Sequence, residues 1–287
     1  MPKKILMKEH IVFIRDKKVR YLEKNVHAPD TLVILHGIGS TANTFIPLSK
    51  EFKKNIHLIA LDFPGRGSTE LTSNTIESFS DWLKEFLEYL GLEKVSLLGT
   101  SLGGAVAFKF SHKYPEMVKK LIVVAPPISS HEICKSRKTL LQFVLWVLNK
   151  SIIIKGITKL IKKINDKWLS RLVKVYAALN RKWKRDIYEN LDKESILYTL
   201  RSYNLAALKD LLQDLKIFDL RNILSEITAP TLAIMGGKDE AVNPESLNKM
   251  EKLIPNITAK LFPEENHMIF LVKPKLLAET ILEFLQY

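Results

Sequence analysis

The chain has 287 residues, a hydrophobic fraction of 46% and a net charge of +13 at pH 7. It contains no run of about 20 apolar residues, which excludes a conventional membrane-spanning helix, and its one cysteine, Cys134, excludes an internal disulfide. The first residues carry positive charge but no sustained apolar stretch, so we expect no secretory signal and a cytoplasmic protein.

Short apolar runs alternate with amphipathic segments in the first part of the chain. The runs predict strands near residues 10–14, 19–23, 31–36, 57–61, 94–98 and 119–125. Helices are predicted near 44–53, 75–90 and 102–113. The alternation resumes later, with strands near 230–235 and 258–262 and helices near 244–253 and 273–285. This order predicts an α/β fold whose mostly parallel sheet is flanked by helices on both faces.

The alternation stops between residues 129 and 226. This segment has few glycines and few strand-like runs, and its pattern is helical. We therefore predict one core domain made of residues 1–128 and 227–287, with residues 129–226 inserted into it as a helical cap.

The segment Gly99-Thr100-Ser101-Leu102-Gly103 lies between a predicted strand and a predicted helix. A strand that turns this sharply into a helix crowds the backbone, and glycine two positions to either side of the serine has no Cβ to collide. The serine hydroxyl is then exposed at the edge of the sheet, next to a helix N-terminus that favours developing negative charge. Ser101 is therefore the candidate nucleophile.

A serine nucleophile needs a base to take its proton and an acid to orient that base. With this kind of turn the acid follows the serine in the chain, and the histidine comes last. Of the seven histidines, only His267 lies late enough, in a polar loop before the last helix. Asp239, just after the strand at 230–235, is the predicted acid, with Glu240 as the alternative. Asp62 precedes the serine and is interpreted as a structural turn residue.

Two backbone N–H groups should stabilise the oxyanion that forms during acyl transfer. One belongs to Leu102, the residue after the nucleophile. The other is expected from the loop after the strand at 31–36, where Gly37 and Gly39 let the backbone fold over the site. We assign this second donor to Ile38.

Five matching pieces occur in the expected order along the chain: His36–Gly39, Asp62–Ser68, Gly99–Gly104, Ala229–Thr231 leading to Gly236–Asp239, and Asn266–His267. In these pieces the chain resembles the serine-hydrolase, esterase/lipase-like branch of the α/β-hydrolase superfamily. The resemblance implies the α/β-hydrolase fold, the triad of Ser101, Asp239 and His267, and the donors Ile38 and Leu102. It also implies that the cap shapes the substrate pocket. Superfamily members with an aspartate nucleophile, the dehalogenases and epoxide hydrolases, do not match Ser101.

The positive charge is concentrated in the predicted cap. Lys135 to Arg185 contains fifteen Lys and Arg against one acidic residue, Asp166, so the rest of the chain is close to neutral. Apolar residues recur there at steps of three or four, from Ile153 through Trp168 to Leu172, with lysines on the other side.

Two interpretations of this pattern remain open. In one, the basic cap makes a peripheral contact with anionic lipid at the inner face of the membrane, and its Trp-bearing apolar face enters the interface. In the other, the apolar face packs on the core and the lysines are solvated. The most apolar window, Leu140 to Leu148, is expected to form a buried or interface helix. No nucleic-acid partner is expected, because the chain carries no recognition motif.

The predicted activity is hydrolysis of a carboxylic ester through an acyl-enzyme, with a lipophilic monoacylglycerol- or lysolipid-like ester as the favoured substrate. This mechanism requires no metal or cofactor. A carbon–carbon bond hydrolase, a thioesterase and a catalytically silent binding or scaffold protein stay open as alternatives. An aminopeptidase is disfavoured, because its cap would need acidic residues to hold a substrate ammonium. The sequence gives no prediction of oligomeric state.

Overall fold

The computed structural model describes residues 7–52, 55–134, 164–202 and 204–286 of the chain. Its centre is an eight-stranded sheet in the order β1-β2-β4-β3-β5-β6-β7-β8. The strands are β1 (Lys8–Ile14), β2 (Lys17–Lys24), β3 (Asp30–Leu35), β4 (Ile56–Leu61), β5 (Val95–Thr100), β6 (Val118–Val124), β7 (Thr231–Gly236) and β8 (Ile257–Phe262). Every strand lies within two residues of its predicted position, so the predicted fold class is confirmed.

The strand directions set one edge of the sheet apart. β1 pairs with β2, and β2 with β4, in antiparallel register, whereas all pairings from β4 through β8 are parallel. The carboxyl ends of β3 to β8 therefore meet at one edge. Ser101 and Asp239 follow β5 and β7 directly, which puts both residues at that edge.

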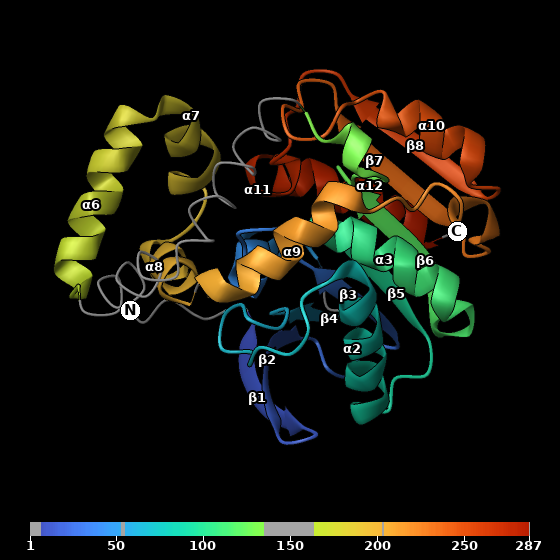
Figure 1. Cartoon of the computed structure of the whole chain (residues 1–287), viewed down its shortest axis with the longest axis horizontal. Helices are drawn as coiled ribbons and strands as arrows, with labels where there is room; N and C mark the ends of the chain where they lie inside the picture. Colours follow the sequence, from blue (N-terminus) through green and yellow to red (C-terminus); the bar gives the residue numbers. More distant parts are fainter. Residues whose placement is uncertain (1–6, 53–54, 135–163, 203, 287) are drawn as a thin grey trace.

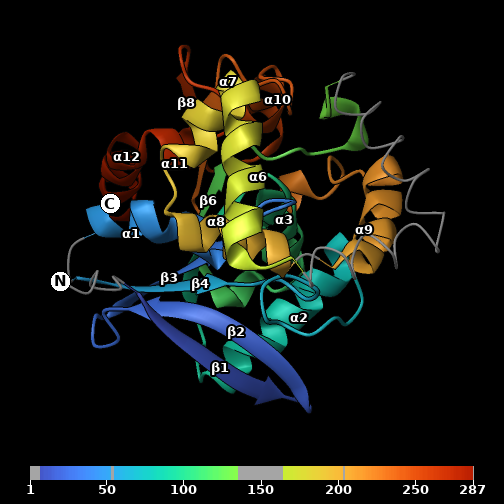
Figure 2. The same cartoon turned by 90° about the vertical axis from the view of Figure 1, so that its left-hand side faces the viewer.

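Alternate residues of the strands face two separate layers of helices, as the period of two in a strand requires. In β3, Leu32 and Ile34 belong to one hydrophobic core, and Val33 and Leu35 to the other. Helices α1, α11 and α12 lie on one face of the sheet, and α2, α3 and α10 on the opposite face (Figures 1 and 2). These helices are α1 (Ile46–Glu51), α2 (Ile76–Tyr89), α3 (Leu102–Lys113), α10 (Ser246–Leu253), α11 (Ile269–Val272) and α12 (Pro274–Gln286).

The start and the buried side of α2 both follow from its sequence. Thr75 accepts a hydrogen bond from the backbone N–H of Ser78, whose side chain accepts one from the backbone N–H of Thr75 in return, so the first turn is capped on both sides. Phe79, Leu83 and Phe86 then recur at steps of three and four and are buried. Because Thr75 is the capping residue, the helix begins at Ile76, one residue later than the sequence predicts.

The described part of residues 129–226 contains helices and no strand of the sheet. The helices are α6 (Asp166–Leu179), α7 (Arg181–Trp183), the π-helical turn η4 (Lys184–Tyr188), α8 (Lys193–Arg201) and α9 (Leu205–Ile217). Helices α6 to α8 stand beside the sheet, and α9 leads back over the face that carries α2 and α3 (Figure 1). The predicted apolar window Leu140 to Leu148 and the first part of the basic stretch lie outside the described residues.

Helix α6 packs on α8 through a small hydrophobic cluster of its own. Leu169 and Val173 are buried in it against Ile196 and Leu197. The sequence pattern places Trp168 and Leu172 on the apolar side of this helix, yet both are exposed. The buried side of α6 is thus offset by one residue from the stripe that carries Trp168 and Leu172.

Candidate active site

Ser101 occupies a strained turn between β5 and α3. Its φ of 51° and ψ of −118° lie in the left-handed half of backbone space, which few non-glycine residues adopt. A Cβ on Gly99 would collide with the carbonyl of Gly103, and one on Gly103 would collide with the carbonyl of Leu35. Both positions therefore admit only glycine, which is the steric requirement expected from the sequence.

The carboxylate of Asp239 is buried and fully hydrogen-bonded. Its Oδ1 accepts the backbone N–H groups of Ala241 and Val242, at 2.8 and 2.9 Å. Its Oδ2 lies 2.7 Å from Nδ1 of His267, in the loop between β8 and α11. A carboxylate bound to Nδ1 holds the imidazole in one orientation and leaves Nε2 to act on a substrate or nucleophile. Glu240, the alternative acid, is exposed and pairs with Lys182 of α7.

Two of the three expected triad residues are therefore in direct contact, and the third lies at the same edge of the sheet. Among the described residues, Ser101 Oγ has no hydrogen bond to His267 or to any other side chain. Without a bound substrate, this hydrogen bond is often long or poorly aligned in enzymes of known mechanism.

The loop that carries Ile38 lies against Ser101. An ideal Cβ on Gly37 would be 3.1 Å from Ser101 Cβ and 3.7 Å from its Oγ, so this backbone approaches the hydroxyl closely. Leu102 is the first residue of α3, so its N–H has no partner within the helix. Both expected oxyanion donors thus belong to backbone next to the hydroxyl.

His36, which the sequence order excludes as the base, holds this loop in place. Its imidazole is buried, Nδ1 contacts the carbonyl of Gly37 at 2.8 Å, and Nε2 accepts the backbone N–H of Phe63 at 3.1 Å. Because Nε2 accepts, the proton of the neutral ring is on Nδ1. Burial lowers the pKa of His36 to about 4, so the ring is uncharged near neutral pH.

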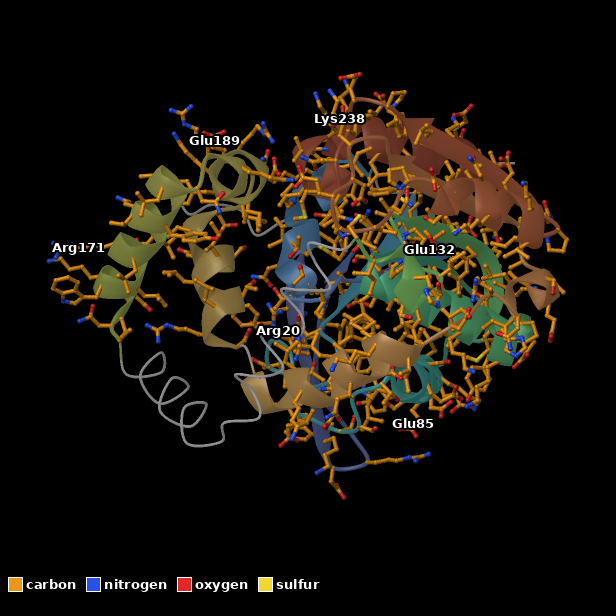
Figure 3. The ribbon with its side chains drawn as sticks, turned by 45° about the horizontal axis from the view of Figure 1, so that its top comes forward. Arg20, Glu85, Glu132, Arg171, Glu189 and Lys238 are labelled. Atoms are coloured by element: carbon orange, nitrogen blue, oxygen red, sulfur yellow. The ribbon has the colours of Figure 1, made fainter. Side chains whose placement is uncertain are left out.

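A buried polar cluster joins helix α8 to the sheet. Asp62 accepts hydrogen bonds from Arg20 at 2.7 Å, from the Ala42 N–H at 2.7 Å and from the Tyr198 hydroxyl of α8 at 3.1 Å. The Arg20 guanidinium also stacks over the Tyr198 ring, 4.3 Å from its centre. Arg20 lies between the core and the cap helices (Figure 3). Asp62, interpreted from the sequence as a structural turn residue, thus also holds α8 in place, and nothing in the sequence pointed to Arg20 or Tyr198 as its partners.

A second polar contact links η4 to the loop of His267. Asp186, in η4, is buried and accepts a hydrogen bond from Asn266 Nδ2 at 3.2 Å. Asn266 Oδ1 accepts the backbone N–H of Met268 at 2.8 Å. Asn266 therefore connects the residue that follows His267 to Asp186 of η4. The Asn266-His267 pair identifies this loop in the sequence, but no sequence pattern identifies Asp186 as its partner.

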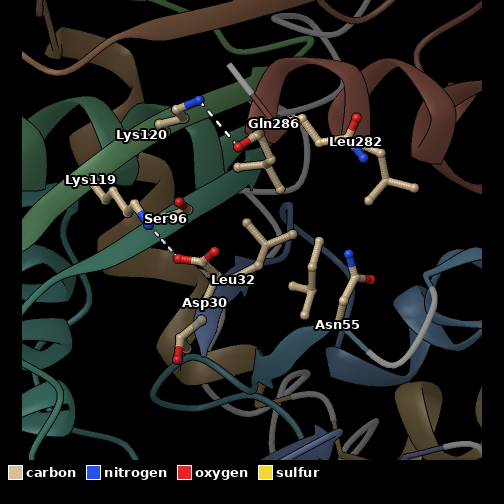
Figure 4. Close-up of a pocket in the computed structure, with 11 residues that line it drawn as sticks. Asp30, Leu32, Asn55, Ser96, Lys119, Lys120, Leu282 and Gln286 are labelled. Carbon is tan, nitrogen blue, oxygen red and sulfur yellow. Dashed lines mark hydrogen bonds and ion pairs between the residues drawn. The ribbon is translucent and has the colours of Figure 1, made fainter. Parts of the chain in front are cut away.

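A hollow of ≈ 210 Å³ lies at the other edge of the sheet, lined by residues that include Asp30, Ser96 and Lys120 (Figure 4). Asp30 begins β3 and Ser96 lies near the start of β5, whereas Ser101 follows the end of β5. Lys120 Nζ donates to the carbonyl of Phe284 at 2.8 Å. This hollow is therefore separate from the candidate active site.

In the part of the chain that the structure describes, no group of three or more His, Cys, Asp or Glu side chains is arranged to hold a metal ion. No described helix is long and apolar enough to cross a membrane.

A family model described as the alpha/beta hydrolase fold matches residues 30–274. The chain belongs to this family. It is 26% identical over 266 residues to the human monoacylglycerol lipase ABHD6, covering 90% of this chain and 76% of that protein.

Solved structures share the fold of this α/β-hydrolase chain. A bacterial membrane phospholipase A superposes with a TM-score of 0.75 at 18% identity, covering 98% of this chain and 86% of that one. An esterase from Exiguobacterium antarcticum gives a TM-score of 0.73 at 19% identity, covering 98% of this chain and all of that one. These structures therefore share the α/β-hydrolase fold with this chain over nearly its whole length.

Proposed function

We propose that this chain is a serine hydrolase that cleaves a lipophilic carboxylic ester through an acyl-enzyme on Ser101. The observation that carries the proposal is the pairing of a buried, fully bonded Asp239 with His267, at the sheet edge where Ser101 is held in a strained turn. Backbone strain of this kind is common at catalytic sites.

In the proposed mechanism, His267 Nε2 takes the proton of Ser101 as its Oγ attacks the ester carbonyl. Asp239 keeps the imidazole oriented and stabilises its charged form. The backbone N–H groups of Ile38 and Leu102 stabilise the oxyanion, and the loss of one such donor typically costs 10²- to 10³-fold in rate. His267 then gives the proton to the leaving alcohol, and water releases the acid by the same steps.

The preference for a lipophilic ester is supported by relatives and by the cap. The human relative is named a monoacylglycerol lipase. Tyr198 of α8 is hydrogen-bonded to Asp62, which follows β4, and Asp186 of η4 to Asn266, next to His267. We propose that residues 129–226 act as the unit that selects the acyl chain, and that a monoacylglycerol- or lysolipid-like ester is the substrate.

Labelling by a fluorophosphonate probe tests the nucleophile directly. We expect stoichiometric labelling of the wild-type chain at Ser101, and none of a Ser101→Ala variant with an unchanged circular dichroism spectrum. Cys134→Ser, which removes the only thiol of the chain, is the control for labelling elsewhere. Labelling that survives in Ser101→Ala refutes the assignment, and a wild-type chain that never reacts identifies a binding protein instead.

A series of p-nitrophenyl esters and matched thioesters of increasing acyl length then tests the substrate class. We expect kcat/KM to rise with acyl length and to favour the oxygen esters. Asp239→Asn should lower kcat by about 10⁴-fold, because the imidazole loses its orienting acceptor. Glu240→Gln is the matched control and should change kcat little, since Glu240 pairs with Lys182 at the surface. Equal loss in both variants contradicts the assignment of the acid.

A further inference from the structure

Helix α6 has two apolar sides, and only one of them packs against other parts of the described structure. Leu169, Val173 and Ala177 are buried, and Leu169 and Val173 pack on α8. A second apolar stripe recurs at helical spacing and is between 51% and 81% exposed: Trp168, Leu172, Val175, Tyr176 and Leu179. A surface helix normally carries polar residues where it does not face the core, and a contiguous exposed apolar patch marks an interaction site.

Cations border this stripe from the first turn of the helix to Lys174. Lys167, Arg171 and Lys174 are exposed and lie on the adjoining side of α6. Arg171 projects from the helix away from the core (Figure 3), and its guanidinium lies 5.0 Å from the centre of the Trp168 ring. Among the described residues these three cations form no ion pair. The one acidic residue of the helix, Asp166, is bound by Arg201 at 2.6 Å.

Most of the cations that follow α6 are paired. In α7 and η4, Lys182 pairs with Glu240, Lys184 with Glu189 and Arg185 with Asp186, whereas Arg181 is exposed. The unpaired positive charge next to the apolar stripe therefore comes mainly from α6 itself, over the same turns that expose Trp168 and Tyr176.

We propose that the outer side of α6 docks on an anionic lipid bilayer, with Trp168, Leu172 and Leu179 entering the interface and Lys167, Arg171 and Lys174 contacting lipid headgroups. An interfacial helix needs this combination: an apolar side with aromatic residues that have a polar edge, next to a basic side. This proposal rests on the surface of α6 and goes beyond the proposed catalysis, so either can fail without the other.

Charge complementarity selects lipid over a second copy of the chain. In a symmetric dimer through this stripe, the cations of one α6 would face those of the other, in a chain whose net charge is already +13. An anionic bilayer offers the opposite sign and attracts each basic side chain near its surface, by about five-fold in binding constant per residue.

Flotation of the full chain with vesicles tests the proposal. The two vesicle types are phosphatidylcholine alone and an equimolar mixture of phosphatidylcholine and phosphatidylglycerol. We expect the wild-type chain to float with the anionic vesicles and to stay behind with the neutral ones. High salt should release it, because the headgroup contacts are screened. A chain that floats with neither vesicle type overturns the proposal.

Two variants separate the apolar stripe from the bordering charge. Leu172→Asp should weaken binding by at least about ten-fold, because a carboxylate then sits at the centre of the inserted side. The triple variant Lys167→Gln, Arg171→Gln and Lys174→Gln should weaken it by about 10²-fold. Both changes are at exposed positions, so the melting temperature should hold; if Leu172→Asp fails to fold, Leu179→Asp tests the same stripe from its most exposed residue.

Matched controls lie elsewhere on the surface. Ile217→Asp changes another exposed apolar residue at the end of a helix, and Lys252→Gln with Lys273→Gln and Lys275→Gln removes three exposed cations far along the chain. Neither control should alter flotation. Equal loss in the controls refutes a specific site, and a wild-type dimer that Leu172→Asp dissociates in analytical ultracentrifugation shows that a second copy covers the stripe instead.

Discussion

Acidification should destabilise this protein through one buried histidine. His36 is 1% exposed and makes two hydrogen bonds that need a neutral ring with its proton on Nδ1. Protonation of Nε2 would remove the acceptor of the Phe63 N–H and bury a positive charge. The perturbation is therefore a shift from pH 8 to pH 5, which adds that proton in the unfolded chain but not in the folded one.

The size of the effect follows from the two pKa values. The ordinary value of 6.5 applies to the unfolded chain, and burial lowers the pKa of folded His36 to about 4. Between these values the unfolded state binds more protons, so the free energy of unfolding falls as the pH falls. The loss from this one group is about 2 kcal/mol at pH 5 and about 3 kcal/mol at pH 4, relative to pH 8.

Urea denaturation of the wild-type chain and of His36→Gln at pH 8 and pH 5 measures this term. The variant is less stable at pH 8, but the gap between the two proteins should narrow by about 2 kcal/mol at pH 5, because the glutamine does not titrate. His27→Gln, which removes an exposed histidine, is the matched control. A gap that stays the same at both pH values refutes a buried neutral His36; so does an NMR titration in which the His36 ring protonates near pH 6.5.

Three more predictions concern the turn and the two cap contacts. Gly103→Ala should lower the free energy of unfolding by at least about 2 kcal/mol, because its Cβ would collide with the Leu35 carbonyl. Gly91→Ala is the control: Gly91 has a φ of +67° but open space around it, so the free energy of unfolding in the same urea titration should fall by only about 1 kcal/mol. Tyr198→Phe keeps the ring and loses the hydroxyl bound to Asp62, so calorimetry should show a loss of about 1–3 kcal/mol. Asp186→Ala should lower kcat on a p-nitrophenyl ester by about ten-fold or more, because the His267 loop loses the hydrogen bond from Asn266 to Asp186. An unchanged kcat would show that this hydrogen bond does not position His267.

The central strands were the easiest to predict, because they are mostly apolar runs buried on both faces of the parallel part of the sheet. In β4 and β7 all six residues are buried, so the pattern does not depend on any particular neighbour. Short elements were harder to predict. Helix α11 covers four residues directly after the His267 loop and was missed, because one turn is too short to show a helical period.

The positions of Ser101, Asp239 and His267 relative to the strands could be predicted. Each residue follows an apolar run that forms a strand. His267 lies 28 residues after Asp239, yet the two are joined at 2.7 Å, because β7 and β8 are neighbouring parallel strands. The role of His36 could not be predicted. It depends on the Phe63 N–H, which belongs to a loop that comes close only after β3 and β4 have paired.

The buried side of α6 could not be predicted, for a different physical reason. Helical periodicity shows that a helix has an apolar side, but not which of two such sides will be buried. In α6 that choice is made by α8, whose Ile196 and Leu197 meet Leu169 and Val173 rather than Trp168 and Leu172. A sequence window that contains only α6 does not contain this information.

The position of the cap and the geometry of the site are not independent of each other. Tyr198 holds α8 to Asp62, whose other oxygen fixes the Ala42 N–H. Asp186 holds η4 to Asn266, next to His267. Each tie joins residues more than 75 positions apart in the chain and is made by a single polar pair. Helices grafted from a relative in place of α6 to α8 could therefore fill the same space and still leave Asp62 and Asn266 without these partners. Because buried groups without partners are costly, we expect such an exchange in this chain to require matching changes in the loops that carry Asp62 and Asn266.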